Sequence, residues 1–422
     1  MRNKSNLGKG LFALFGVAMT LVFSAPSQAV PAFARQTGKA CATCHFQHYP
    51  ALNDYGRDFK ANGYVAMGKQ GTIKGSKDNE LSMPDVLNAS LFLKIRHQQS
   101  NGSDKPNEPS QASGQWQAPD EFALLFGGRI TPNIGYMLEG QLANGAAAFV
   151  AGFKMPFMYD VAGKKVGVIP FTTDALGAAY GFELLNTGAV RNVRVMEHRN
   201  ESSAQQYIGT ATPAMGAAFI ISDPSWFINF SRWSPNHAAT AEGLTGGAPS
   251  SNYLRLAYTP SVGDWDVGVG AQFWGGSSRR DDGTGSGTDQ LMVTKAWALD
   301  AQAQGIFMNR PLGLYLTHAN AAAQNAGEKN LYNTAKNAKT ATTFAVEYGI
   351  IPNKATLMLA YRIADNGAAV DSQDNAVTIG GTYQFAQNVQ LQFQHSNRSG
   401  LRYEGTAIKG NSLTTFMLSS GF

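Results

Sequence analysis

The residues with the most specific chemistry lie close together near the start of the chain. Cys41 and Cys44 are the only cysteines among 422 residues, and His45 directly follows the second one. Cys-Ala-Thr-Cys-His is the attachment pattern of a c-type haem, because two thiols at this spacing reach both vinyl groups while the next residue offers its imidazole to the iron. The pattern predicts one covalently bound haem c, attached to Cys41 and Cys44, with His45 as an axial iron ligand.

Three other uses of these thiols agree less well with the surrounding sequence. A thioredoxin-like redox pair is expected before a helix in a βαβ unit and does not require the histidine. A zinc site would lack a fourth ligand of the usual kind unless His48 served. A disulfide between residues this close in the chain would be strained. Haem attachment is therefore the favoured interpretation.

The residues after the motif predict a helix over Pro50 to Ala61. Leu52, Tyr55 and Phe59 recur at helical spacing, and Asn62-Gly63 supplies a stop signal. We expect this apolar face to cover one side of the haem. Charge-assisted hydrogen bonds to the haem propionates are expected from basic residues nearby. The candidates for that role are Arg35, Arg57 and Lys60.

The second axial ligand of the iron is predicted from position along the chain. His48 follows His45 by three residues and would lie on nearly the same helical face, so it cannot easily reach the opposite side of the same haem. Met67 and Met83 follow the predicted helix and can fold back toward it. Met67 is the favoured distal ligand, and a Met/His pair would raise the reduction potential.

The first residues predict export from the cytoplasm. Met1 to Ala29 has a basic start, an apolar run over Leu11 to Phe23 and a small-residue cleavage site at Ser27-Gln28-Ala29. These are the features of a secretory signal peptide, with a mature chain that begins near Val30. The apolar run is short and a cleavage site follows it, so a retained membrane helix is the weaker interpretation.

The composition predicts a large sheet protein. Charged residues make up only 15% of the chain, aromatic residues 11%, and glycines number 46. The mean hydropathy of −0.21 is too low for helical membrane spans. After the signal peptide, no run approaches the roughly 20 apolar residues that a spanning helix needs. The net charge of +5 comes without a cluster of Lys and Arg interleaved with aromatics, so no nucleic-acid partner is predicted.

Beyond about residue 81 the chain alternates between apolar and polar residues. In Val389 to His395, Val, Leu and Phe share one face while three Gln share the other, as in a strand that is wet on one side. The polar face carries mostly Gln, Gly, Asn and Ala instead of the Lys and Glu expected on a soluble sandwich. The same alternation recurs in Trp265 to Phe273, Trp297 to Gln304, Phe344 to Tyr348 and Leu357 to Ile363.

The connections between these strands alternate between short turns and long polar loops. This asymmetry is typical of outer-membrane barrels, which have tight periplasmic turns and long outer loops. Predicted short turns are Thr131 to Asn133, Thr259 to Gly263, Met308 to Pro311, Ile351 to Asn353 and Ala386 to Asn388. Predicted long loops include Ser234 to Ser251, Asn320 to Thr340 and Asp365 to Asn375.

The end of the chain supports a closed barrel. Ser412 to Phe422 alternates and ends on an aromatic residue, as outer-membrane barrels commonly do, and a strand at the end of the chain can close the sheet and remove its edge. About 20 residues per strand and loop predicts about 16 strands, in a range of 14 to 18, with residues 143–218 hard to register. No fixed-period repeat supports a β-solenoid. The tryptophans expected in interfacial girdles are Trp226, Trp233, Trp265, Trp274 and Trp297.

These features together predict a mainly β protein with a small helical domain in front. The predicted parts are a signal peptide over residues 1–29, a monohaem cytochrome c domain over residues 30–80 that plugs the barrel, and an antiparallel outer-membrane β-barrel over residues 81–422. We expect the barrel to contact outer-membrane lipid.

Further matches surround the haem motif within residues 30–64. Val30 to Gly38 leads into the motif, and after it come His48-Tyr49-Pro50-Ala51-Leu52, Gly56-Arg57, Phe59-Lys60 and Gly63-Tyr64. In these residues the chain resembles the fused outer-membrane cytochrome-porin family of iron-oxidising bacteria, whose members carry one c-type haem ahead of a porin-like barrel. Outside residues 30–64 the resemblance is one of architecture.

The resemblance implies an Fe(II) oxidase, an iron:cytochrome c oxidoreductase in the outer membrane of a Gram-negative bacterium. Extracellular Fe(II) would be the electron donor and a periplasmic c-type cytochrome the acceptor, with the haem domain periplasmic or within the barrel. Because ferric iron is insoluble near neutral pH, oxidation outside the cell avoids precipitation inside it. Two alternatives remain: an outward electron conduit that acts as a reductase, and a diffusion porin whose haem domain senses redox state.

Such a function needs few catalytic side chains, because outer-sphere electron transfer uses no nucleophile or general base. We expect the inward faces of the strands to line a polar passage that leads to the haem. Oxygen ligands on these faces could hold Fe(II) transiently, although pairing across the pore is the favoured role for each charge. The charged residues predicted to face the lumen are Lys94, Arg129, Glu139, Arg255, Asp266, Asp300, Glu347 and Arg362.

Overall fold

The computed structural model describes most of the chain after the predicted signal peptide. The described residues are 31–68, 70–77, 80–102, 112–143, 149–191, 195–235, 238–240, 243–281, 289–325, 327–404 and 410–422. The signal peptide predicted over residues 1–29 lies outside them, as do parts of several predicted long loops.

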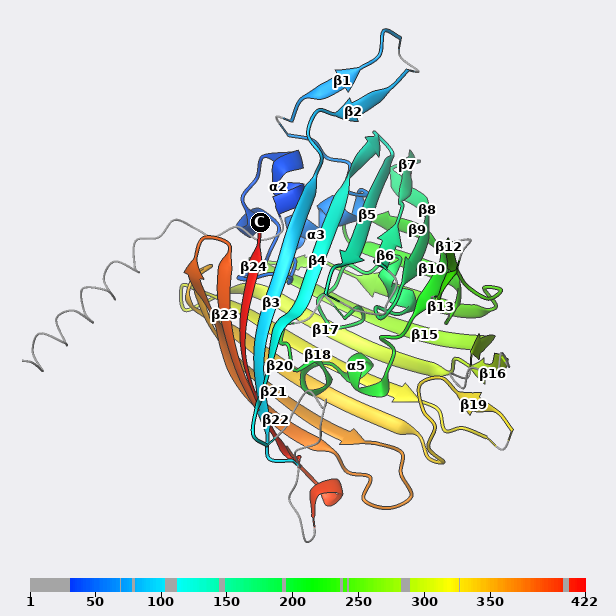
Figure 1. Cartoon of the computed structure of the whole chain (residues 1–422), viewed down its shortest axis with the longest axis vertical. Coiled ribbons are helices and arrows are strands. Elements are labelled where there is room, and N and C mark those ends of the chain that lie inside the picture. Colours follow the sequence, from blue (N-terminus) through cyan, green and yellow to red (C-terminus); the bar gives the residue numbers. More distant parts are fainter. Residues whose placement is uncertain are drawn as a thin grey trace, which may run out of the picture.

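The strands close into one antiparallel barrel with sixteen crossings, so the predicted architecture and the predicted number of about 16 are confirmed (Figure 1). Two of the crossings are interrupted and consist of two short strands each. In chain order the crossings are β3 (Ala89–Ser100), β4 (Gln115–Thr131), β5 (Ile134–Gln141), β6 (Val150–Lys154) with β7 (Phe157–Val161), β8 (Lys164–Thr173), β9 (Ala214–Asp223), β10 (Trp226–Ser234), β13 (Ser251–Tyr258) with β14 (Ser261–Val262), β15 (Trp265–Asp281), β17 (Ala296–Phe307), β18 (Arg310–Ala321), β20 (Lys339–Ile351), β21 (Ala355–Asp365), β22 (Asn375–Ala386), β23 (Val389–Ser399) and β24 (Ser412–Gly421).

The remaining elements are short. At the rim, β16 (Asp289–Val293) and β19 (Lys329–Asn330) extend the sheet, and β11 (Ala238–Thr240) pairs with β12 (Gly243–Thr245). A hairpin of β1 (Thr72–Lys74) and β2 (Ser82–Pro84) projects beyond the barrel (Figure 1). The helices are α2 (Pro31–Thr37), η2 (Cys41–Thr43), α3 (Asp54–Ala61), η3 (Ala178–Tyr180), α4 (Arg199–Ser202), α5 (Ala204–Ile208) and η4 (Leu401–Tyr403). In the described part of the chain, no helix is long and apolar enough to cross a membrane.

The barrel is apolar outside and largely polar inside, which inverts the pattern of a soluble domain. On β21 the exposed residues are apolar: Leu357 is 57% exposed and Leu359 is 48% exposed, whereas the alternating Arg362 is buried. On β23, Leu391 and Phe393 lie outside while Gln392 and Gln394 are buried inside. An outward apolar band is what lipid chains require, so the predicted alternation is confirmed.

The last strand closes the barrel as predicted. β24 pairs with β3, and the terminal Phe422 exchanges both backbone hydrogen bonds with Leu91, at 2.8 and 3.0 Å. The predicted short turns are also present. Two of them place Asn353 and Asn388 at φ of 57° and 61°, in the left-handed region where asparagine is favoured.

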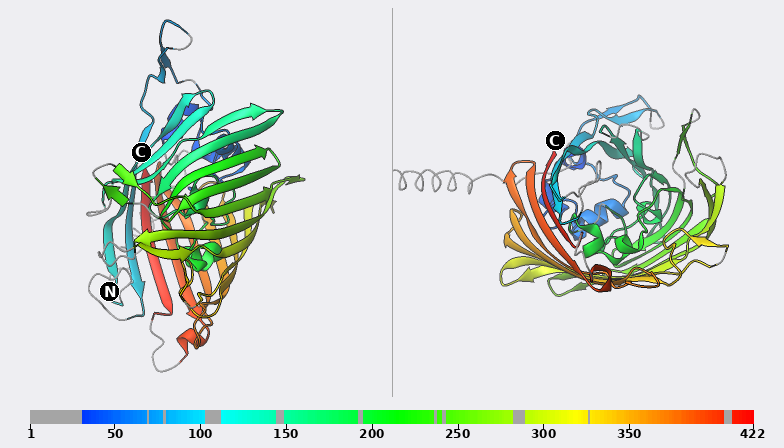
Figure 2. Two further views of the ribbon diagram at one scale, coloured as in Figure 1. Left: turned by 90° about the vertical axis from the view of Figure 1, so that its right-hand side faces the viewer. Right: turned by 60° about the horizontal axis from the view of Figure 1, so that its bottom comes forward.

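Two segments fold into the barrel and fill it, one from the N-terminus and one from the β8–β9 connection (Figure 2). We call residues 31–64, which contain α2, η2 and α3, the plug. We call residues 174–213, which contain η3, α4 and α5, the inward segment. The plug lies at the end of the barrel that carries the short turns, since Gln47 and His48 share a small cavity with the turn residues Asn353 and Asn388.

The inward segment explains why residues 143–218 are hard to register as strands. It is almost wholly buried, and Leu185 and Ile208 belong to an apolar cluster that reaches the inner faces of several strands. Trp233 and Trp274 are buried in this cluster, so the interfacial girdle predicted for these two residues is wrong. Both lie on the inward face of their strands, where packing against the inward segment replaces contact with the membrane interface.

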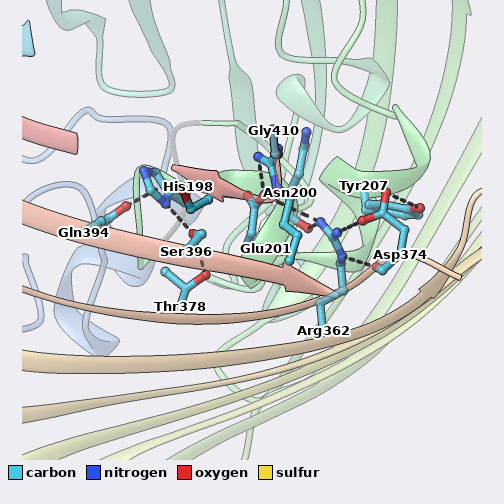
Figure 3. A network of polar contacts seen from close by, with 12 residues as sticks. His198, Asn200, Glu201, Tyr207, Arg362, Asp374, Thr378, Gln394, Ser396 and Gly410 are labelled. Atoms are coloured by element: carbon cyan, nitrogen blue, oxygen red, sulfur yellow. Dashed lines mark hydrogen bonds and ion pairs between the residues drawn. The ribbon is translucent and has the colours of Figure 1, made fainter. Parts of the chain in front are cut away.

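Polar contacts fix the inward segment to β21, β23 and the loop before β22 (Figure 3). The guanidinium of Arg362 donates to the backbone oxygen of Asn200 at 3.1 Å and forms an ion pair with Asp374. Arg398 donates to Glu201 at 2.9 Å. Glu201 of α4 thus pairs with Arg398 and lies 3.7 Å from Arg362, and Tyr207 of α5 donates to Asp374 at 3.2 Å. These contacts between the segment and the wall hold α4 and α5 in one position.

Candidate functional site: a cavity between the plug and the barrel wall

The haem motif lies on a short 3₁₀ turn that α3 holds in place. The backbone N–H groups of Cys44 and His45 both donate to the Cys41 oxygen, at 3.0 and 2.8 Å. Asn53 caps α3 and donates from its side chain to the Thr43 oxygen at 3.1 Å. A Cβ at Gly56 would lie 2.1 Å from the Cys44 oxygen, so only glycine lets α3 approach the motif this closely. No disulfide joins Cys41 and Cys44.

The predicted helix over Pro50 to Ala61 is shorter in the structure and begins at Asp54. Asn53 takes the cap position because its side chain accepts from the Gly56 N–H at 3.0 Å. Before it, Pro50 belongs to a turn and Leu52 forms an isolated bridge with His45. The sequence-based interpretation missed α2 altogether.

His45 is oriented as an iron ligand would be. Its Nδ1 lies 3.2 Å from the Ala51 oxygen, which accepts a hydrogen bond from the Nδ1–H group and leaves Nε2 as the possible ligating atom. Burial lowers the pKa of His45 to about 4, so the ring is neutral near pH 7. The neutral imidazole is the form that binds metals.

An open cavity separates the haem motif from the barrel wall, with about 1030 Å³ of empty space including its mouth. One side is made by the plug and the other by β4, β5 and β6. From the plug come Ala32, Phe33, Ala34, Thr37, Lys39, Ala40, Cys41, Cys44, His45, Tyr49, Pro50, Leu52, Gly56, Phe59, Lys60 and Tyr64, and from the wall Leu125, Phe126, Gly127, Met137 and Lys154.

The lining of this cavity fits a haem. Both motif cysteines and His45 border a mostly apolar space, and its described lining holds basic residues without any Asp or Glu. Burial lowers the pKa of Lys60 to about 8, and the nearby carboxylate of Glu183 only partly offsets this effect. The two propionates of a haem would supply further negative charge. Lys60 and Lys154, from opposite sides of the cavity, are the residues placed to meet it.

The other residues predicted to surround the haem lie elsewhere. Arg57 forms an ion pair with Asp266 on the barrel wall, and Arg35 donates to the backbone oxygen of Ala89. Neither arginine lines the cavity, so of the three predicted propionate partners only Lys60 is in place. On α3, Phe59 lines the cavity whereas Tyr55 is 39% exposed. The close contact of Gly56 with the motif turns the tyrosine outward.

The structure does not place Met67 at this cavity. Gln36 holds the neighbouring backbone: its side-chain amide donates to the Ala66 oxygen at 2.8 Å, and its backbone oxygen accepts from the Gly68 N–H at 2.9 Å. Met67 is half-buried beside α2 and is absent from the described lining. Met83, on the projecting hairpin, is 45% exposed.

The plug is fixed to both the wall and the inward segment. Asn186 exchanges two hydrogen bonds with the Leu52 backbone, at 2.8 and 2.7 Å. His48 places Nδ1 2.7 Å from the Tyr49 oxygen and Nε2 2.9 Å from Glu347 on β20. Both ring nitrogens of His48 are therefore engaged. The described residues contain no group of three or more His, Cys, Asp or Glu side chains that could hold a metal ion.

A second, polar chamber adjoins the cavity on the inner side of β3, β4 and β5. Tyr49, Leu125 and Met137 line both spaces. Carboxylates and basic residues occur in equal number in the chamber lining: Asp120, Glu121, Glu139 and Asp174 face Lys94, Arg96, Arg191 and Arg199. This polar chamber lies beside β3, β4 and β5, and the inward segment packs against inner faces of other strands. The polar passage to the haem stays a prediction.

Most charges predicted to face the lumen are paired, as favoured from the sequence. The pairs join strand to strand, strand to plug or strand to connecting loop. They are Lys94 with Glu121 at 2.7 Å, Glu347 with His48 at 2.9 Å, Asp266 with Arg57, Arg255 with Asp300, and Arg362 with Asp374.

Comparison with known proteins identifies the fold. No protein-family model matches the chain, and no curated protein does. Among solved structures, OmpF of Salmonella typhi in complex with daunomycin has a TM-score of 0.50 and 12% identity over 80% of this chain and 97% of that chain. The channel DcaP of Acinetobacter baumannii gives 0.48 and 11% over 80% and 97%, and an OmpT loop-deletion mutant of Vibrio cholerae gives 0.46 and 11% over 80% and 99%. The chain has a porin-like barrel fold.

Proposed function

We propose that this protein is an outer-membrane Fe(II) oxidase. Each Fe(II) loses one electron and becomes Fe(III), and one oxidised c-type cytochrome in the periplasm gains that electron. The observation that carries the proposal is an open, mostly apolar cavity, bordered by Cys41, Cys44 and His45, inside a porin-like barrel. The resemblance of residues 30–64 to cytochrome-porin fusions of iron-oxidising bacteria supplies the substrate.

The plug residues have defined tasks in this proposal. A haem attached to Cys41 and Cys44 would supply a one-electron couple in the low-dielectric interior. His45 is held neutral and oriented by the Ala51 oxygen, and Lys60 and Lys154 neutralise propionate charge. Phe33 and Phe59 pack at 5.2 Å between ring centroids and contribute apolar surface to the cavity.

The polar chamber supports an approach of Fe(II) from the outer side. Its carboxylate oxygens are the hard ligands that a divalent iron ion accepts. Two of them are already neutralised, since Asp120 pairs with Arg96 and Glu121 with Lys94. A balanced set of charges favours transient contact over tight retention, which suits a substrate that must leave as Fe(III).

The orientation of the barrel supports a periplasmic acceptor. In outer-membrane barrels the short turns face the periplasm and the long loops face outward. The plug lies at the short-turn end, so a soluble cytochrome could approach it from the periplasm. Lys39, which lines the cavity, lies over the ring of the exposed Tyr55 at 5.3 Å.

The test is anaerobic mixing of the purified, oxidised protein in detergent with Fe(II), followed by haem absorbance. We expect rapid haem reduction. A haem that dithionite reduces but Fe(II) does not would overturn the proposal. The reduction potential separates the outward conduit from the oxidase, because a conduit that delivers electrons outward needs a lower potential than an acceptor of electrons from Fe(II).

The porin-like fold favours a diffusion porin as the second candidate. That function requires an open lumen, whereas the inward segment is buried against the inner wall. Single-channel conductance in planar bilayers separates the two. We expect conductance far below that of an open porin, and a stable open channel would favour the diffusion porin.

A further inference from the structure

Met137 is the one methionine among the described residues that line the haem cavity. It lies on β5, where Met137, Glu139 and Gln141 alternate along the strand and all three line the polar chamber. Successive side chains of a strand point to opposite faces, so Met137 points into the barrel.

The neighbours of Met137 on the adjacent strands border the same cavity. Across the sheet, Gly127, Met137 and Lys154 form one row of paired positions on β4, β5 and β6. All three border the cavity. A Cβ at Gly127 would lie 2.7 Å from the Phe33 ring, so the glycine lets the plug approach the wall next to Met137.

Met137 and His45 belong to opposite sides of the cavity. His45 is bound to the plug backbone through Ala51, and the plug forms one wall. The other wall is the barrel strand that carries Met137. Two axial ligands of one iron must approach from opposite faces of the haem, and a thioether paired with an imidazole is an established ligand set.

The other possible donors in the lining are already engaged or lie on the wrong side. Lys154 donates to the Tyr180 oxygen at 3.1 Å, and Lys60, with a pKa of about 8, is mostly an ammonium without a lone pair at neutral pH. The Tyr64 ring stacks on Phe33 at 5.0 Å, and burial raises the pKa of its phenol above the usual range. The Tyr49 ring lies edge-on to His45 at 5.6 Å, on the same side of the cavity.

We propose that the Met137 thioether is the second axial ligand of the haem iron. The inference rests on the proposed function, because it requires an attached haem. It assigns the second axial ligand to the barrel wall, whereas the sequence predicts Met67 for that role. The haem would then be bound by the plug and ligated by the barrel, which requires the two to be docked. Because Met137 also borders the polar chamber, the ligand would stand between the Fe(II) approach route and the iron.

The test compares Met137→Leu with Met67→Leu in the full-length, haem-loaded protein. Leucine keeps most of the methionine volume and removes the sulfur. We expect Met137→Leu to lose the charge-transfer band of a ferric iron–thioether bond, to bind added cyanide or carbon monoxide more readily, and to have a lower reduction potential. Met67→Leu is expected to keep the wild-type spectrum and potential.

The outcomes separate this inference from the proposed function. Loss of the band in Met67→Leu with retention in Met137→Leu would overturn the inference and restore the sequence-based assignment. A wild-type protein with attached haem but no thioether signal, by the same band or by the NMR signal of a bound methionine methyl group, would also overturn it, even if Met137→Leu fails to fold. Absence of attached haem would instead refute the proposed function.

Discussion

The plug and the inward segment both lie inside the barrel, but they meet its wall in different ways. The plug leaves an apolar cavity between itself and β4 to β6. The inward segment packs against the wall and brings buried charges that pair with it. Glu183, for example, accepts from Arg255 at 2.8 Å, and Arg255 also pairs with Asp300. One interface has space for a cofactor, and the other has specific polar contacts.

This difference indicates how the barrel divides its interior. A buried charge that loses its partner is strongly destabilising. The ion pairs of the inward segment therefore hold the segment in one arrangement within the lumen. The plug uses fewer charged contacts with the wall and joins the inward segment through the amide of Asn186. The inward segment therefore occupies part of the lumen, and an apolar cavity remains between the plug and the wall.

The largest expected effect is on the plug. Replacement of both motif cysteines, Cys41→Ser with Cys44→Ser, removes both thioether attachments. We expect complete loss of covalently bound haem and of absorbance change with Fe(II), because covalent attachment requires the thiols. The barrel should still fold, which heat-dependent migration in detergent gels can check. A variant that keeps covalent haem would refute the attachment assignment.

The second effect concerns the inward segment. Arg255→Ala removes the shared partner of Glu183 and Asp300, all three of them buried. We expect the free energy of unfolding to fall by about 3–5 kcal/mol, since two carboxylates lose their counter-ion. Denaturant unfolding in micelles measures it. A loss below about 1 kcal/mol would show that this network does not fix the segment.

Much of the barrel was predictable because lipid imposes a simple rule on every strand. The alternation in Val389 to His395 appears in the structure as apolar residues outside and glutamines inside. The inward segment was not predictable in this way. Its residues are buried by walls that come from distant strands, so neither an alternating nor a helical pattern was required.

The candidate site likewise has a part that was predictable from the sequence and a part that was not. Cys41, Cys44 and His45 stand out because attachment requires a local spacing. The opposite wall, with Met137 and Lys154, lies about a hundred residues later in the sequence. It meets the haem motif only because the plug folds into the closed barrel. One sequence signal was present for Met137: it occupies the inward face of its strand together with Glu139, whereas methionine would suit the outer face.

A smaller effect is expected where the two regions meet. Asn186→Ala removes both hydrogen bonds to Leu52 and leaves a buried backbone N–H without that acceptor, at a cost of about 1–3 kcal/mol. We expect hydrogen exchange at the Leu52 amide to rise on the order of tenfold. Asn62→Ala is the matched control, because Asn62 bonds only within its own helix region, to Asp58. Equal changes in both variants would contradict a specific contact between the regions.

The smallest effect is expected for an ion pair outside both regions. Lys165 and Asp160 pair at 2.9 Å on the β7–β8 hairpin, and the Asp160 side chain is 69% exposed. Water and salt screen this pair, so Lys165→Ala should change the free energy of unfolding by about 0.5 kcal/mol or less. The same denaturant titration as for Arg255→Ala measures it. If Arg255→Ala and Lys165→Ala lowered the free energy of unfolding by similar amounts, burial would not strengthen the ion pairs of the inward segment. The buried pairs would then contribute no more than the exposed pair of the β7–β8 hairpin.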